Sequence, residues 1–288
     1  MNVPSAADLA SRLNLHRAAR SYRGACPACG YPNAFSLRVG KDNRIGMFCA
    51  NCGDRGAIAD AVVRAVGGAW TPPAATTPAD DTAARQRKQE AAACLWNGST
   101  PAAGTIADAY LTGRALPGLA ASPSLRFRGD CHHPEGGRLP ALVALVQDVA
   151  GMPIAAHRTY LRRDGTGKAE AEPAKASIGP VWGGAIRLDT IAEEIVVGEG
   201  IETAASAGRL LGLPAWCAVS AGNLARGLVL PPDVRRVMIA ADADAPGEAA
   251  ALAAARRWRG EGREVQITRP DKPGADFNDM LVARGRVA

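Results

Sequence analysis

Two C-x2-C pairs near the N-terminus restrict the fold of this chain more than any other feature. They are separated by 19 residues and consist of Cys26, Cys29, Cys49 and Cys52. Each pair offers two thiolates from one tight turn, and zinc requires four ligands in a tetrahedron. A disulfide pair or a redox site is the alternative, but the spacing favours structural zinc. Because so short a segment buries little apolar surface, we expect the metal to supply much of its folding free energy.

The residues between the two pairs alternate in the manner of a two-stranded hairpin. Strands are predicted over 35–39 and 44–48, with a turn at 41–43. Aromatic residues are interspersed here with the cations Arg38 and Arg44. Aromatic faces can stack on unpaired bases while cations contact phosphates, so we expect this surface to bind single-stranded nucleic acid. The alternative is that the cysteine site only stabilises the fold, with some of the aromatic residues forming its small core.

Charge and cysteine usage narrow the class of protein. Residues 1–70 contain nine Lys or Arg against four Asp, which is consistent with contact to a polyanion. Of the seven cysteines only four are paired by spacing, which fits a metal site in a reducing compartment, and we expect a cytoplasmic location. No run of about 18 apolar residues occurs, so no membrane partner is expected.

Changes in composition divide the chain into four segments. The linker is rich in Pro, Thr and Ala without apolar periodicity. The basic segment contains two apolar runs at 139–161 that predict two strands joined by a turn at 151–153. The segments are a zinc-binding domain (1–68), a linker (69–89), a basic subdomain (90–192) and an α/β domain (193–288).

The last hundred residues alternate between short apolar runs and Ala-rich helical segments. Alternation of this kind predicts a parallel sheet covered by helices on both faces. The expected strands are 194–198, 215–219, 236–241 and 264–268, and the expected helices are 201–211 and 247–259.

Acidic residues directly follow two of these strands. Glu199 and Gly200 follow the first strand, and Asp242 and Asp244 follow the third. Because parallel strands end at the same edge of a sheet, these carboxylates should converge and bind a divalent cation, Mg²⁺ or Mn²⁺. Asp-x-Asp by itself would indicate an ordinary turn or a calcium loop, but the strand–Glu–Gly–helix pattern upstream favours the catalytic metal. Other acids expected near this edge are Glu202, Asp276 and Asp279.

The phrases VVGEGIETAAS and IAADADAPG resemble the Toprim domain of bacterial-type primases, type IA and II topoisomerases, some nucleases and recombination-mediator proteins. The resemblance covers about residues 193–284. It implies that Glu199 acts as an acid/base or metal carboxylate and that Asp242 and Asp244 bind the metal. Glu202, Asp276 and Asp279 are less specific matches to the same site.

Two further resemblances concern the rest of the chain. The cysteine segment resembles the zinc ribbon of bacterial-type primases, but Cys29 stands where many of them carry His. Residues 90–190 resemble the basic subdomain of phage- and plasmid-type Toprim primases through the phrases DAYLTGR, AKASIG and GGAIRL. The implied fold class is α/β: a Rossmann-like parallel Toprim sheet with a mixed α+β basic subdomain, preceded by a small zinc-ribbon domain.

The basic subdomain holds cations that we expect near the template or the nucleoside triphosphate, because Arg and Lys bind phosphate oxygens. A solvated hairpin face is the alternative, since acids are interspersed among them. The cations are Arg158, Arg162, Arg163, Lys168 and Lys175, in addition to Arg38 and Arg44 of the ribbon.

Ribbon, basic subdomain and Toprim domain in this order predict a primase that makes short primers on single-stranded DNA. A Toprim nuclease or a non-catalytic recombination mediator is the alternative, and a topoisomerase would need a nucleophilic Tyr on a separate large domain. No P-loop of the GxxxxGK[ST] type occurs, so a replicative helicase would be a separate polypeptide. The family resemblance implies a phage, a plasmid or another mobile genetic element as the origin.

Overall fold

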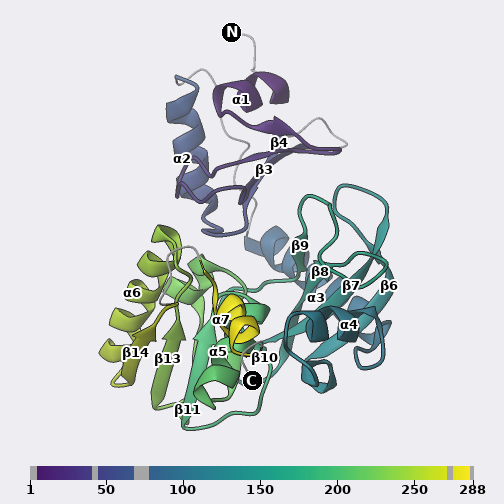
Figure 1. Cartoon of the computed structure of the whole chain (residues 1–288). Coiled ribbons are helices and arrows are strands. Elements are labelled where there is room, and N and C mark those ends of the chain that lie inside the picture. Colours follow the sequence, from purple (N-terminus) through teal and green to yellow (C-terminus); the bar gives the residue numbers. More distant parts are fainter. Residues whose placement is uncertain (1–4, 41–44, 68–77, 271–274, 286–288) are drawn as a thin grey trace. The chain divides into compact units, whose positions relative to one another are not determined.

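Two structural units are present in the computed structural model, which describes residues 5–40, 45–67, 78–270 and 275–285 (Figure 1). Unit 1 comprises residues 1–81 with 134–136, and unit 2 comprises residues 82–133 with 137–288. None of the helices in the described residues is both long enough and apolar enough to span a bilayer.

Unit 1 contains the cysteine pairs and a four-stranded antiparallel sheet of order β1-β2-β3-β4. The predicted hairpin is confirmed, with Phe35 opposite Cys49; its turn at 41–43 and Arg44 lie outside the described residues. Phe35 and Leu37 are fully buried and pack with residues of both helices. The elements are α1 (Ala6–Arg12), β1 (His16–Arg17), β2 (Tyr22–Gly24), β3 (Phe35–Val39), β4 (Ile45–Cys49) and α2 (Arg55–Ala65).

Helix α3 (Pro78–Asn97) occupies part of the segment that was expected to be a linker. The helix shows the secondary structure of residues 78–89, and the assignment of 69–89 as a linker stays a prediction; residues 69–77 lie outside the described part of the chain. Ala, Arg, Gln, Glu and Lys dominate residues 83–93, and these are the strongest helix formers. Proline is tolerated in the first turn of a helix because the N–H that it lacks has no helical partner there.

The first sheet of unit 2 is antiparallel, with the order β5-β6-β7-β8-β9. The predicted hairpin over 139–161 is confirmed as β7 and β8. Its turn is closed by Asp148, whose Oδ1 accepts hydrogen bonds from the backbone N–H groups of Ala150 and Met152 at 3.0 and 2.9 Å. The elements are β5 (Thr100–Pro101), α4 (Ile106–Gly113), the 3-10 turn η1 (Leu119–Ala121), β6 (Leu125–His132), β7 (Arg138–Gln147), β8 (Pro153–Tyr160) and β9 (Lys175–Ile178).

The second sheet of unit 2 has the order β10-β12-β11-β13-β14. The four predicted strands are parallel to one another, which confirms the predicted parallel sheet. Strand β10, which was not predicted, adds to its edge by antiparallel pairing with β12. Ala185 bridges Gln147 of the first sheet, so the chain enters the second sheet from that side. The elements are β10 (Ile186–Arg187), β11 (Glu194–Gly198), α5 (Ile201–Leu211), β12 (Ala215–Cys217), the π-helix η2 (Asn223–Gly227), β13 (Arg236–Ala240), α6 (Ala245–Gly260), β14 (Glu264–Thr268) and α7 (Phe277–Gly285).

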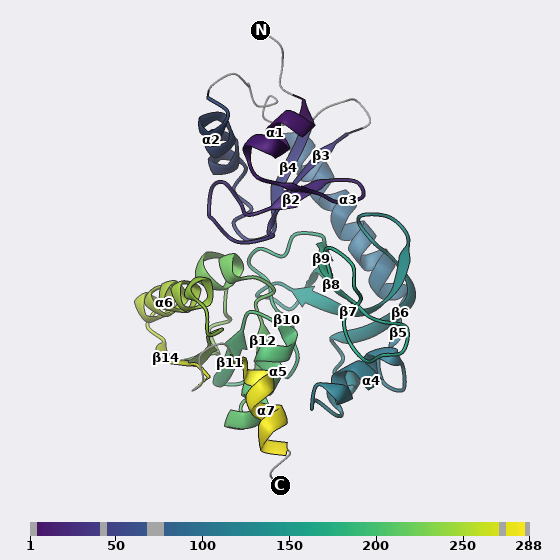
Figure 2. The ribbon, with the colours of Figure 1, turned by 45° about the horizontal axis from the view of Figure 1, so that its top comes forward.

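Helix α5 is the centre of unit 2. Its residues 201–208 are all buried, and α7 lies alongside it in both views (Figures 1 and 2). The hydrophobic core joins α5 to α4, to strands of the first sheet and to β11 and β12, so the two sheets share one core. Gly198 allows the close approach of β11, because a Cβ there would lie 2.9 Å from the backbone nitrogen of Ala204. Polar side chains on so buried a helix require partners inside the protein.

Candidate active site and zinc site

The four predicted zinc ligands come together in unit 1. The Sγ atoms of Cys26 and Cys52 lie 3.9 Å apart, those of Cys29 and Cys49 lie 3.8 Å apart, and all four lie within 4.8 Å of one another. A zinc tetrahedron with bonds of about 2.3 Å places its sulfur atoms about 3.8 Å apart, so the cluster fits structural zinc. Among the described residues, no other group of three or more Cys, His, Asp or Glu side chains brings its ligand atoms so close.

The ribbon residues expected to bind nucleic acid occupy different environments. Phe48 is 59% exposed, whereas Phe35 belongs to the core. The Nη2 atom of Arg38 lies 2.8 Å from Oε1 of Glu135, one of the residues 134–136 of unit 1. The exposed aromatic face is therefore smaller than the sequence pattern indicates.

The second sheet of unit 2 brings the predicted carboxylates to one edge. Strands β11 and β13 pair in parallel with Gly198 opposite Ala240, so Glu199 and Asp242 follow them at the same edge. They line a cavity of about 370 Å³. Its other acidic lining residues are Glu202, Asp244, Asp276 and Asp279, and its basic lining residues are Arg114, Lys168 and Lys175.

Asp242 is one of the half-buried acids of this cavity. Its Oδ1 atom accepts a hydrogen bond of 3.2 Å from the hydroxyl of Thr203. Burial raises the pKa of Asp242, and the neighbouring carboxylates of Asp244 and Asp276 add to the rise against the effects of Thr203 and Lys175. A bound cation would oppose this rise, because it favours the charged form of the carboxylate.

Three of the other carboxylates also cap helices. Asp244 is the N-cap of α6, and its Oδ1 accepts a hydrogen bond of 2.7 Å from the N–H of Gly247. At the start of α7, Oδ1 of Asp276 accepts from the N–H of Asp279 at 2.7 Å, and Oδ2 of Asp279 accepts from the N–H of Asp276 at 3.1 Å. Their positions are thus explained by capping, and their expected role as metal ligands stays a prediction.

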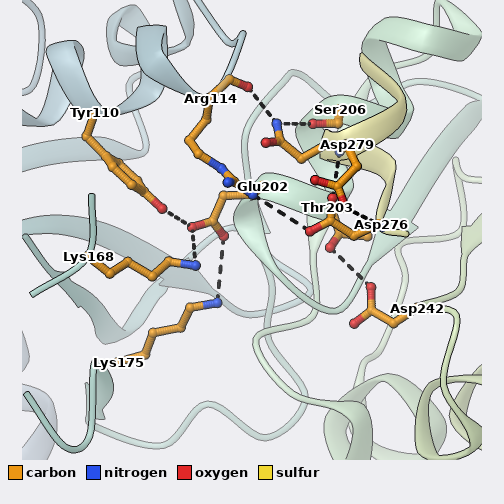
Figure 3. A network of polar contacts seen from close by, with 11 residues as sticks. Tyr110, Arg114, Lys168, Lys175, Glu202, Thr203, Ser206, Asp242, Asp276 and Asp279 are labelled. Carbon is orange, nitrogen blue, oxygen red and sulfur yellow. Dashed lines mark hydrogen bonds and ion pairs between the residues drawn. The ribbon is translucent and has the colours of Figure 1, made fainter. Parts of the chain in front are cut away.

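Glu202 is buried on the first turn of α5, between residues of the first sheet and α4 (Figure 3). Its Oε1 atom accepts a hydrogen bond of 2.5 Å from the Tyr110 hydroxyl and lies 2.9 Å from Nζ of Lys168. Its Oε2 atom lies 3.7 Å from Nζ of Lys175. Burial opposes ionisation, but the two lysines and Tyr110 hold the pKa of Glu202 well below its usual range. Both carboxylate oxygens of Glu202, which was expected to bind a metal, are therefore already paired with protein groups.

Of the five cations expected in the basic subdomain, the structure brings Lys168 and Lys175 to the cavity and not the three arginines. In the β8–β9 pair Lys175 is opposite Thr159, whereas Arg158 is opposite Ala176. Neighbouring positions in a strand point to opposite faces, so Arg158 and Lys175 do not share a face. Arg158 is buried, and its guanidinium donates to the carbonyl oxygens of His132, Ala176 and Ser177. Arg162 pairs with Glu170, and Arg163 is exposed.

Two family models match the chain. Residues 86–188 match a domain of unknown function, DUF7146, and residues 194–287 match the Toprim domain. The second match coincides with the strands and helices that carry the carboxylates. Residues 194–287 are a Toprim domain.

Solved structures with similar folds include a DNA primase domain from Pseudomonas aeruginosa, with 16% identity and a TM-score of 0.46 over 69% of this chain and 78% of that one. The Aquifex aeolicus primase with its zinc-binding and RNA polymerase domains has 15% identity and a TM-score of 0.47 over 99% and 81%. The primase fragment of the bacteriophage T7 primase-helicase protein has 15% identity and a TM-score of 0.39 over 92% and 96%. The likeness is one of fold alone. No curated protein sequence matches the chain.

The Toprim domain provides the acids of the cavity, and residues outside it provide the cations. Sequence reasoning missed Tyr110, Arg114 and Thr203. Tyr110 and Arg114 lie in the phrase DAYLTGR, on and just after α4, and Nη2 of Arg114 lies 3.7 Å from Oδ2 of Asp276. Their spacing of four residues puts them on one helix face, and this spacing could have indicated from the sequence that both reach the same site.

A larger groove of about 930 Å³ lies at the other end of α5, around Gly208, Arg209 and Arg187. It contains none of the carboxylates that the Toprim resemblance assigns to catalysis. Its size alone does not make it the candidate site, because the carboxylates predicted for catalysis line the smaller cavity.

Proposed function

We propose that this chain is a primase that synthesises short oligonucleotides on single-stranded DNA from nucleoside triphosphates. One observation carries the proposal: the Toprim carboxylates face Lys168 and Lys175 across a single cavity. A nucleoside triphosphate brings about four negative charges, and its phosphate oxygens bind both to lysine ammonium groups and to metal cations. A zinc-ribbon-like cysteine cluster preceding this arrangement supports polymerisation on a template over simple hydrolysis.

In the proposed reaction, the 3′-oxygen of one nucleotide forms a bond to the α-phosphorus of the next. The bond between that phosphorus and the oxygen leading to the β-phosphate breaks, and pyrophosphate leaves. Glu199 accepts the proton of the 3′-hydroxyl group, and the lysines hold the phosphate chain. Divalent cations bound by Asp242 and Asp244 would supply positive charge to the attacking and leaving oxygens.

The test is synthesis without a pre-existing primer on single-stranded DNA with nucleoside triphosphates and Mg²⁺ or Mn²⁺. Asp242→Asn keeps an acceptor for Thr203 but removes the charge, and it should lower the rate of synthesis by at least about 100-fold. Asp233→Asn, at an exposed position outside the cavity, is the matched control and should retain the activity.

Two outcomes would overturn the proposal. Cleavage of DNA in the absence of nucleotides, lost in Asp242→Asn, would identify a nuclease. Binding of DNA with neither synthesis nor cleavage would identify a non-catalytic mediator. Unchanged synthesis by Asp242→Asn would refute the assignment of the site.

A further inference from the structure

Glu202 differs from the other acids of the cavity in its surroundings. Its side chain is 8% exposed, whereas those of Lys168 and Lys175 are 34% and 40% exposed. The acid is thus largely enclosed, whereas both lysine side chains stay partly exposed and line the cavity. A single carboxylate between two ammonium groups leaves one positive charge in excess.

The three charged groups come from different parts of the fold. Glu202 lies on α5 of the Toprim domain, Lys175 begins β9, and Lys168 lies in the segment that returns to Leu161 at the end of β8. Lysine side chains have long flexible stems, and two ammonium groups at close range repel each other. Among the side chains in this cluster, the Glu202 carboxylate is the group that pairs with both ammonium groups.

Tyr110 limits the positions that the Glu202 carboxylate can take. Its hydroxyl group is buried and donates to the same oxygen that pairs with Lys168. A buried carboxylate that already accepts from a hydroxyl and contacts two ammonium groups would have to lose these contacts in order to bind a cation. The contacts therefore favour a positioning role over metal binding.

We propose that Glu202, held by Tyr110, is a positioning residue that fixes Lys168 and Lys175 for binding the phosphate chain of the incoming nucleotide. This inference rests on the proposed function for the identity of the nucleotide as substrate. The carboxylate itself touches neither nucleotide nor metal. It sets the distance and direction of the two ammonium groups relative to Asp242 and its neighbours.

The experiment measures two binding constants separately on the full chain. ATP binding is measured by equilibrium dialysis with Mg²⁺ and without template, and Mn²⁺ binding is measured by electron paramagnetic resonance without nucleotide. Glu202→Gln should weaken ATP binding by about tenfold or more, since charge-assisted contacts of both lysines lose their geometry. The affinity for Mn²⁺ should change by less than about twofold, whereas Asp242→Asn should lower it strongly.

The matched control is Glu248→Gln. Glu248 also lies in the first turn of a helix of the Toprim domain, but it is exposed and pairs with Arg269 outside the cavity. Both binding constants should stay within about twofold of those of the unaltered chain. Circular dichroism shows whether each variant is folded.

Tyr110→Phe provides a second route if Glu202→Gln does not fold. It keeps the ring and removes the hydroxyl donor, and it should weaken ATP binding by about threefold without changing Mn²⁺ binding. The inference is overturned if Glu202→Gln, or Tyr110→Phe in its place, lowers Mn²⁺ affinity and leaves ATP binding unchanged. Because neither measurement requires primer synthesis, failure of the proposed function would show in the synthesis assay alone.

Discussion

Replacing Asn223 by Ala should lower the free energy of unfolding of unit 2 by about 3 kcal/mol. Asn223 is the first residue of η2 and is completely buried. Its Oδ1 atom accepts from the N–H of Gly183 at 2.9 Å, and its Nδ2 atom donates to the carbonyl oxygens of Gly184 and Ala218 at 2.8 Å each. One side chain thus ties the segment before β10 to the segment after β12.

The magnitude follows from these three contacts. A buried hydrogen bond contributes about 1 kcal/mol net. When one partner is removed, the remaining buried group has no hydrogen bond in the folded protein, whereas water would satisfy it in the unfolded chain. Asn223→Asp tests the direction of the bonds. It keeps an acceptor for Gly183 but presents an oxygen to two carbonyl oxygens, so it should cost at least as much as alanine.

Urea unfolding followed by tryptophan fluorescence measures the change, because Trp96, Trp182, Trp216 and Trp258 all belong to unit 2. Asn97→Ala, at an exposed position in the same unit, is the control and should lie within about 0.5 kcal/mol of the unaltered chain. The reasoning is refuted if Asn223→Asp is as stable as the unaltered chain, or if Asn223→Ala behaves like the control.

Two further predictions concern the zinc site and the acid stability. Cys49→Ser should reduce the amount of bound zinc, measured by atomic absorption, and should make unit 1 sensitive to protease. The unfolding of unit 2 should be unchanged. Stoichiometric zinc in this variant would contradict the assignment. Burial, assisted by Lys175, lowers the pKa of His157 to about 3, so the unfolded chain, with a pKa of about 6.5, binds this proton first. The contribution of His157 to the free energy of unfolding should be fully present above pH 6.5. Below that pH the free energy of unfolding should fall toward pH 3 by up to about 1.4 kcal/mol per pH unit. His157→Gln should make this decline shallower in urea titrations, and equal slopes would contradict the prediction.

The sequence predicted the four Toprim strands and the helices α5 and α6, because local signals and tertiary contacts agree there, but it did not predict α7 or η2. Helix α5 ends where Gly212 adopts a left-handed conformation with φ of 68°, and the apolar run before Gly198 is buried as β11. Strand β10 was not predicted, because its two residues carry no periodicity and its direction depends on the bridge between Ala185 and Gln147. Pairing of this kind is set by distant parts of the chain.

The acids that line the cavity were predicted, and so were Lys168 and Lys175, but Tyr110, Arg114 and Thr203 were not. Convergence of Glu199 and Asp242 follows from parallel pairing alone. Which cations reach the cavity depends on the register of β8 and β9, and a shift by one residue exchanges the faces of the sheet. The pattern of charges therefore indicated Arg158 and Lys175 equally, whereas register brings only Lys175 to the site.

In the described part of the Toprim domain, the three α-helices all begin at the acidic edge, α5 after Gly200, α6 after Asp244 and α7 after Asp276. Each helix start carries about half a positive elementary charge from its aligned peptide dipoles. Three such starts offset part of the repulsion among the carboxylates. The same backbone field attracts phosphate, so the helix starts would favour the nucleotide binding proposed for this cavity.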